Sequence, residues 1–191
     1  MAGERLSIAQ VSPHPWGAPH EVNDFVARVA TALGERGHRL VVAAPAGSRA
    51  AVRESRRLIR AAQEHPSALF DGSWKGERAG GDGPAVLSVG STLAMPRGPR
   101  PPAAPLPIDL GRPLEELLGG VALDVVHVHD PFAPSAGSVA LRHSRSLNVG
   151  SFHEPTERVL STQVARPLVE IFFGRLDART TSCGKIGRAH V

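Results

Sequence analysis

The chain has 191 residues, enough for one domain with its own core, and its 41% hydrophobic and 21% charged residues are ordinary for a globular protein. Its net charge of +4 comes almost entirely from arginine, and an aromatic content of 4% without tyrosine argues against a platform that stacks single-stranded nucleic acid. A single cysteine, Cys183, excludes an internal disulfide framework, and no apolar run approaches the ~18 residues of a membrane span, so we expect a soluble cytoplasmic protein that does not bind nucleic acid.

The first part of the chain alternates strands and helices. Arg5 to Val11 is predicted to form a strand, and a loop rich in proline follows from Ser12 to Pro19. Apolar residues then repeat at helical spacing between Val22 and Leu33. We expect a second strand over Leu40 to Ala44, closed by Pro45. This β-α-β order predicts a parallel sheet.

A second helix is predicted over Ala50 to Ala62, and five arginines fall within an arc of about 100° around it. Such a basic face is able to bind acidic ligands or to lie on an anionic membrane, which would place the protein at the inner face of the plasma membrane. The alternative is an ordinary solvated helix face. The five residues are Arg49, Arg53, Arg56, Arg57 and Arg60.

The segment from Gly72 to Pro113 is rich in glycine and proline, and most of it is predicted to be turn and extended polyproline-like chain. Ala85 to Val89 is expected to form a strand within it. A short helix over Leu114 to Leu118 then leads to the next strand.

The run LDVVHVHDPFAPS, from Leu123 to Ser135, predicts a buried strand that ends at Asp130, because Pro131 cannot continue a central strand. His127, His129 and Asp130 therefore gather at the carboxyl end of a strand, where ligands bind in open parallel sheets. His127 is either a hydrogen-bonded core residue or part of a site, whereas the site interpretation is favoured for His129 and Asp130.

Polar residues also follow two other predicted strands. His14 and His20 come after the first strand, and His153 and Glu154 follow the strand over residues 148–152. Because the carboxyl ends of parallel strands meet at one edge, we expect these side chains and His129 to line a common rim. The remaining predicted elements are a helix over Ser138 to Ser146, the strand over Asn148 to Phe152, a helix over Leu160 to Phe173 and a strand over Ala178 to Ser182.

Histidine suits proton transfer near neutral pH and bonds sugar hydroxyls. The HxHD cluster also permits a metal-dependent hydrolase that uses His127, His129, Asp130 and His153, although no HExxH or CxxC pattern accompanies it. The absence of GxGxxG, GxxxxGK[ST] and GxSxG argues against a dinucleotide site, a P-loop and a serine nucleophile. A stand-alone module that binds a sugar or an anion is a further alternative.

Three stretches, in this order, resemble GT-B glycosyltransferases of family 4: IAQVSPHPWGAPHEVNDFVARVATALGERGHRLVVAAP, LDVVHVHDPFAPS and SFHEPTE. Within that family the likeness is to phosphatidylinositol mannosyltransferases and related actinobacterial enzymes, and it covers most of Arg5 to Ser182. The resemblance implies an α/β fold with a doubly wound, mostly parallel, Rossmann-like sheet that forms one half of a GT-B architecture. It also implies retaining transfer from a nucleotide-sugar co-substrate to a lipid, glycan or small-molecule acceptor, with no cofactor and no required metal.

The resemblance assigns roles to individual residues of the rim. His153 falls on the family's functionally important histidine and is the expected catalytic residue. His129 and Asp130 fall on the HE-P motif of the cleft floor, with aspartate in place of glutamate. His14 lies where a side chain often contacts the acceptor, and Glu154 stands where the family has a hydroxyl residue. The residues expected to bind acceptor or substrate are therefore His14, His129, Asp130 and Glu154.

The expected donor loop departs from the family pattern. His20 and Glu21 occupy the positions of a Gly-Gly pair, which lets a helix N-terminus approach the donor diphosphate closely. Glu21 places a negative charge there, although it would also interact favourably with the helix dipole. Inositol-lipid specificity is therefore not expected to carry over.

The resemblance also bears on the extent of the chain. Residues 1–183 are expected to be the N-terminal, acceptor-side domain, with the Gly/Pro-rich excursion at about residues 72–113. The C-terminal donor domain, with its phosphate-neutralising cations and E-x7-E motif, is expected to be absent, so the fragment is predicted to be inactive alone. Residues 184–191 are expected to be a non-native tail, because IGRAHV resembles a reading frame of a sequencing adapter.

Overall fold

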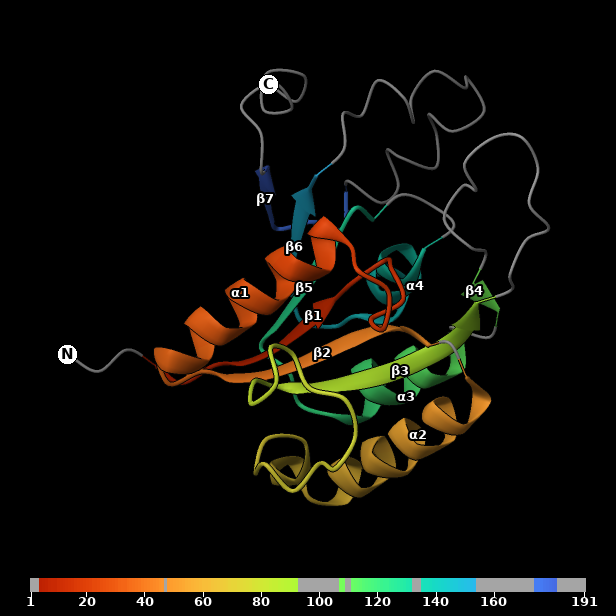
Figure 1. Ribbon diagram of the computed structural model, residues 1–191. Coiled ribbons are helices and arrows are strands. Elements are labelled where there is room, and N and C mark those ends of the chain that lie inside the picture. Colours follow the sequence, from red (N-terminus) through yellow and green to blue (C-terminus); the bar gives the residue numbers. More distant parts are fainter. Residues whose placement is uncertain are drawn as a thin grey trace, which may run out of the picture.

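The computed structural model describes residues 4–46, 48–92, 107–108, 111–131, 135–153 and 174–181, which form a seven-stranded sheet flanked by helices (Figure 1). The strands are β1 (Ser7–Val11), β2 (Arg39–Ala46), β3 (Ala85–Thr92), β4 (Pro107–Ile108), β5 (Val125–His129), β6 (Leu147–Phe152) and β7 (Ala178–Thr181). The helices are α1 (Glu21–Glu35), α2 (Arg49–Glu64), the 3-10 turn η1 (Pro66–Leu69), α3 (Gly111–Gly120) and α4 (Ala136–His143).

The strands lie in the order β4-β3-β2-β1-β5-β6-β7. Among these strands β4 pairs antiparallel with β3, and every other neighbouring pair is parallel. The chain runs outward from β1 to β3 and then returns to place β5 on the other side of β1. The order therefore reverses between β1 and β5, where ligands bind in sheets of this kind. This topology confirms the predicted doubly wound, mostly parallel α/β fold.

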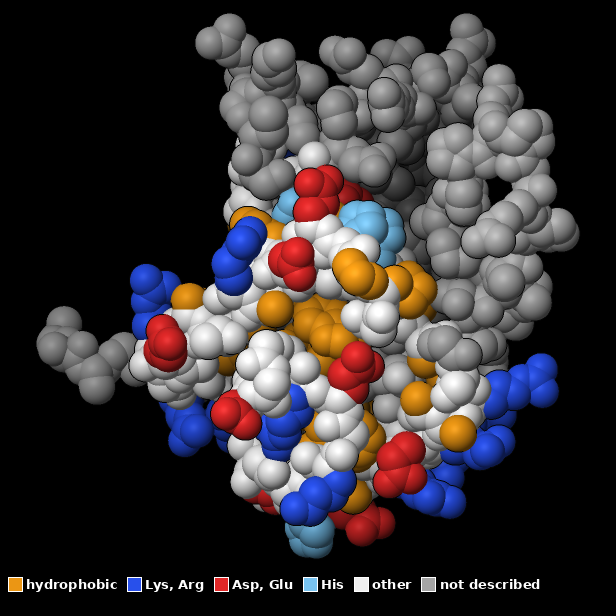
Figure 2. Space-filling model, viewed as in Figure 1, with side chains coloured by type: hydrophobic (Ala, Val, Ile, Leu, Met, Phe, Trp, Pro, Cys, Tyr) orange, Lys and Arg blue, Asp and Glu red, His pale blue; other side chains and the backbone are white. Residues whose placement is uncertain are grey.

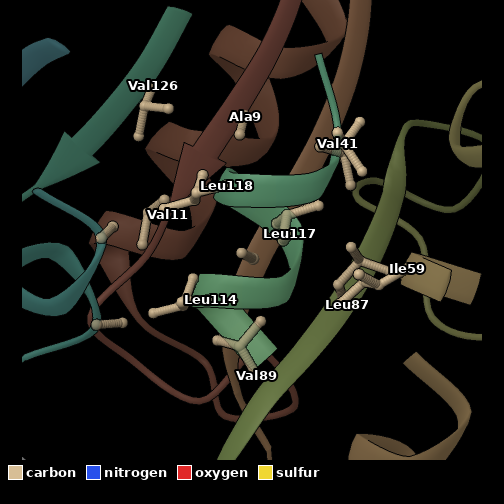
Figure 3. Packing of buried hydrophobic residues seen from close by; sticks show 14 of the residues in the cluster. Ala9, Val11, Val41, Ile59, Leu87, Val89, Leu114, Leu117, Leu118 and Val126 are labelled. Carbon is tan, nitrogen blue, oxygen red and sulfur yellow. The ribbon is translucent and has the colours of Figure 1, made fainter. Parts of the chain in front are cut away.

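Hydrophobic clusters on both faces of the sheet hold the helices in place. On one face α1 buries Val22, Val26 and Ala30, whose spacing of four residues gives the helix one apolar stripe. On the other face α3 directs Leu114 and Leu117 toward the sheet and α2, as Figure 3 shows. Both leucines are fully buried. Burial of each contributes about 1.5–3 kcal/mol to the stability of the fold.

The second strand differs from its prediction. β2 continues through Pro45 to Ala46 instead of ending at Ala44. The register against β3 shifts between these alanines, since Ala44 pairs with Ser88 and Ala46 pairs with Ser91. An irregularity of this kind accommodates the missing N–H of a proline inside a strand. The prediction that Pro45 closes the strand was wrong.

The observed bounds of other strands and helices also differ from the predicted ones. β1 begins at Ser7, two residues later than predicted, and β4 lies in the segment that was expected to lack regular structure. α4 begins at Ala136 because Ser135 caps it, in a capping box with Ser138. The helix then ends at His143, three residues before the predicted end. The helix predicted over residues 160–173 and the tail over residues 184–191 lie outside the described residues.

Candidate functional site

Five histidines gather at the carboxyl edge of β1, β5 and β6, and we call them the histidine cluster. Figure 2 shows histidine side chains at the upper end of the described surface, beside acidic side chains. The ring of Phe25, from α1, lies 4.8 Å from the ring of His153 and 5.9 Å from that of His129, measured between centroids. α1 therefore closes one side of the cluster. Its members are His14, His20, His127, His129 and His153.

His129 is fully buried and links two polar side chains. Its Nε2 lies 2.8 Å from Oε1 of Gln10, and its Nδ1 lies 3.0 Å from Nε2 of His153. An amide oxygen only accepts hydrogen bonds, so Nε2 of neutral His129 carries the proton and Nδ1 accepts the Nε2–H of His153. Nδ1 of His153 keeps its lone pair and has no hydrogen-bond partner among the described residues. The pair thus offers a nitrogen that accepts the hydrogen of a ligand hydroxyl.

Asp130 fixes the backbone that carries His153. Its φ of 42° lies in the left-handed region, which aspartate tolerates better than most residues. The backbone N–H of Asp130 donates to the carbonyl oxygen of Ser151 at 2.9 Å, and Oδ1 accepts from the N–H of His153 at 2.7 Å. Asp130 therefore joins the ends of β5 and β6 and positions His153, a role that its assignment as a substrate-binding residue did not include.

His127 belongs to a different hydrogen-bond network. Its Nε2 lies 2.7 Å from Oγ of Ser151, which in turn lies 2.5 Å from Oγ1 of Thr180 on β7. Its ring is 4.3 Å from that of His129, so the two histidines of β5 share one face of the sheet as predicted. Of the two interpretations left open for His127, the hydrogen-bonded core residue describes these contacts.

The loop after β1 brings His14 and His20 together. Their rings stack with centroids 3.5 Å apart. His20 is also the N-cap of α1, because its Nδ1 accepts from the N–H of Val22 at 3.2 Å, and Glu21 is the first helical residue. The ring of His20, which was predicted to belong to the donor loop, therefore caps the N-terminus of α1.

Buried Asn23 anchors the same loop. Its Oδ1 accepts from Oγ of Ser12 at 2.6 Å, and its Nδ2 donates to the carbonyl oxygen of Pro15 at 2.9 Å. The loop is thus tied to both β1 and α1, which fixes the position of His14 between them.

Four histidines of the cluster, His14, His127, His129 and His153, have lowered pKa values, which favour their neutral forms. Burial lowers the pKa of His127 and of His14 to about 4, and it lowers the pKa of His129 well below 6.5. Burial also lowers the pKa of His153, although the nearby carboxylates of Asp130 and Glu21 oppose this. A neutral imidazole both donates and accepts, so the rim suits hydroxyl groups better than it suits a charged ligand.

The contacts of the cluster bear on the metal-site alternative. The ring nitrogens of His127, His129 and His153 bond to Ser151, to Gln10 and to each other. Within the described residues no three His, Cys, Asp or Glu side chains are arranged to hold a metal ion.

Sequence reasoning missed two residues of the site and predicted one that lies outside the described residues. Gln10 and Asn23 are buried polar residues that hold the cluster and its loop. The available signal for Gln10 was a polar residue inside the apolar strand β1, and for Asn23 a polar residue beside Val22 on the buried stripe of α1. Glu154 lies outside the described residues.

The arginine face of α2 is smaller than predicted. Arg49, Arg53, Arg57 and Arg60 are exposed. Arg56 instead forms a bidentate ion pair with Glu116 of α3, in which Nε donates to Oε2 at 3.0 Å and Nη2 donates to Oε1. That pair lowers the pKa of Glu116. Of the five arginines predicted to form a basic face, Arg56 is thus half-buried, because α3 packs against that side of α2. Arg57 also pairs with Glu54 at 2.9 Å, and Arg60 lies 4.0 Å from Glu116.

None of the described helices is long and apolar enough to cross a bilayer.

Comparison with known proteins gave consistent matches. Residues 22–189 match the family model described as Glycosyltransferase Family 4. Proteins named phosphatidyl-myo-inositol mannosyltransferase from Mycobacterium tuberculosis and Mycobacterium bovis are 26% identical to the chain over 175 residues, and that from Mycolicibacterium smegmatis is 25% identical over 175 residues. The match covers 90% of this chain, which spans 38% of the length of these relatives.

Proposed function

The chain belongs to glycosyltransferase family 4, and we propose that it forms the acceptor-side half of an enzyme that transfers a sugar from a nucleotide-sugar to a hydroxyl group. The observation that carries the proposal is the His129–His153 pair. It lies at the carboxyl edge of β5 and β6, beside the point where strand order reverses, and it leaves an acceptor nitrogen on a rim that suits hydroxyl ligands.

In this proposal Nδ1 of His153 accepts the hydrogen of the acceptor hydroxyl and so orients the oxygen. The oxygen forms a bond to the anomeric carbon as the bond from that carbon to the nucleoside diphosphate breaks. As that bond forms, the hydroxyl proton passes to Nδ1 of His153, from which the departing diphosphate takes it up. The new bond forms on the face that the diphosphate vacates, so configuration is retained. The positive charge that stabilises the departing diphosphate would come from residues beyond the acceptor half. We propose that no metal ion is required.

The relatives are named as mannosyltransferases that act with phosphatidyl-myo-inositol, which makes a hexose donor and a polyol or lipid acceptor reasonable first probes. The side chains of His20 and Glu21 fill the start of α1. A diphosphate would have to approach past them, so we propose a donor position that is shifted relative to a loop with two glycines.

A cytoplasmic location with peripheral membrane contact is a further part of the proposal. The four exposed arginines of α2 form a basic face that would attract anionic lipid, with each cation near the surface worth about 1 kcal/mol. Sedimentation with vesicles that contain anionic lipid tests this contact. Binding should fall when Arg53→Glu and Arg57→Glu are combined, and unchanged binding would remove the membrane contact from the proposal.

Acceptor binding is measured by NMR on the isotope-labelled chain, with myo-inositol and mannose as probes. Saturable shifts are expected at the imidazole resonances of His129 and His153, and His153→Gln should abolish them. His65→Gln, at an exposed position after α2, is the matched control and should bind normally. Absence of saturable shifts with both probes would contradict the proposed acceptor site.

The half-enzyme proposal also predicts no turnover by the 191-residue chain with a panel of nucleotide-sugars. Measured turnover would refute that part. A reading frame that continues into a second β-α-β domain with an E-x7-E motif would support it.

A further inference from the structure

A cavity of about 320 Å³ lies at the amino-terminal edge of the sheet. Its walls come from the C-terminal half of α1, the starts of β2 and β3 and the loop that precedes β3, and Figure 1 shows these segments side by side. The histidine cluster occupies the opposite, carboxyl edge. The cavity is therefore separate from the proposed active site, and its volume is at the lower end of the range for small-molecule sites.

Arg39 supplies a half-buried positive charge to this cavity. Its guanidinium carbon lies 5.5 Å from the centroid of the Phe70 ring. Its Nε is buried without a hydrogen-bond partner, and within the described residues no carboxylate pairs with the guanidinium. Leaving a buried donor unpaired costs about 1–3 kcal/mol, and more for a charged group. Because Nε has almost no exposed surface, an anionic ligand would act by compensating the charge of the guanidinium from the cavity.

The other charged groups around the cavity favour the same kind of ligand. Arg5 and Arg78 line it together with Arg39, whereas the lining contains one carboxylate, that of Asp82. Nδ1 of His38 accepts from the N–H of Leu6 at 3.2 Å, so the neutral ring carries its hydrogen on Nε2 and has a donor available.

Backbone contacts hold the loop wall of the cavity. Arg78 donates to the carbonyl oxygens of Gly72 at 2.7 Å and Gly83 at 2.8 Å. The N–H of Val86 donates to the carbonyl oxygen of Glu77 at 2.8 Å, which ties the loop to β3. The cavity is therefore formed before any ligand enters, and a ligand would not have to order this loop.

Part of the lining is apolar. Leu40, Leu69 and Phe70 contribute hydrophobic surface, with Phe70 directly beside the guanidinium of Arg39. A phosphate or carboxylate that bonds to Arg39 would thus place an attached carbon skeleton against an aromatic ring.

We propose that this cavity binds a small organic anion, with its phosphate or carboxylate on Arg39 and its apolar part against Phe70. The proposal does not depend on glycosyl transfer, because it concerns the opposite edge of the sheet.

The test is an NMR titration of the isotope-labelled chain at constant ionic strength, with phenyl phosphate, benzoate and inorganic phosphate as separate probes. Saturable amide shifts are expected at residues 38–40 and 69–70. The preference between phenyl phosphate and benzoate identifies the anionic group, and weaker binding of inorganic phosphate supports the contribution of Phe70. No saturable shift at this edge with any of the three probes would overturn the proposal.

Variants identify the binding groups. Arg39→Gln should weaken phenyl phosphate binding about ten-fold, the loss expected for one charge-assisted hydrogen bond. Phe70→Leu keeps the guanidinium, so it should weaken phenyl phosphate but not inorganic phosphate, which keeps the proposal testable if Arg39→Gln fails to fold. Arg57→Gln, on the exposed face of α2, is the matched control. An equal loss in Arg57→Gln would show nonspecific attraction to arginines and refute the site.

Discussion

Lowering the pH from 7 to 5 is expected to destabilise the fold through the histidines that burial keeps neutral. His127 gives the clearest case, because burial and then the charge of His153 lower its pKa from 6.5 to about 4. Between these values the unfolded chain binds a proton that the folded chain does not bind. Stability is therefore greatest above pH 6.5 and falls as the pH drops toward 4.

The magnitude follows from the two pKa values. With a pKa of 6.5 in the unfolded chain and about 4 in the folded chain, His127 alone removes about 2 kcal/mol of unfolding free energy between pH 7 and pH 5. His14 shifts in the same direction but is more exposed, so its contribution is smaller. A loss of this size is a substantial part of the roughly 5–15 kcal/mol that stabilises a typical domain.

Urea unfolding followed by circular dichroism at pH 7, 6 and 5 measures the effect. His127→Gln replaces the titrating ring with a neutral amide that is able to bond Ser151, so its loss of stability between pH 7 and pH 5 should be smaller than that of the wild type by about 2 kcal/mol. His65→Gln, outside the histidine cluster, controls for the loss of any histidine. Equal pH dependence in His127→Gln and the wild type would refute the argument that this buried ring is held neutral.

Gln10→Leu removes the oxygen that accepts from Nε2–H of His129, so the imidazole nitrogen resonances should show mixed tautomers, and unchanged resonances would contradict the assigned proton direction. Leu117→Ala should lower the unfolding free energy by about 2–5 kcal/mol in urea titration, because a fully buried leucine leaves a cavity. A loss under about 1 kcal/mol would mean that α3 is loosely packed. Arg56→Ala should cost about 1 kcal/mol, and a double-mutant cycle with Glu116→Gln should reveal coupling between α2 and α3. Additive effects would count against that ion pair.

The site was predictable in its location but not in its internal contacts. His129 and His153 were identifiable because each stands at the end of a predicted strand, two residues before a proline, and the carboxyl ends of parallel strands share an edge. The direction of the hydrogen bonds between them depends on Gln10, which is 119 residues from His129 in the chain. Only the pairing of β1 with β5 brings these two residues together.

The amino-acid sequence by itself determined most of the strand and helix segments and which family the chain resembles, because apolar periodicity, prolines and short motifs act over a few neighbouring residues. Tertiary structure decided the rest. β2 continues past Pro45 because its pairing with β3 shifts register there. Arg56 is paired and half-buried because α3 brings Glu116, 60 residues away in the chain, against it. Such contacts depend on strand order and helix packing, which local periodicity does not specify.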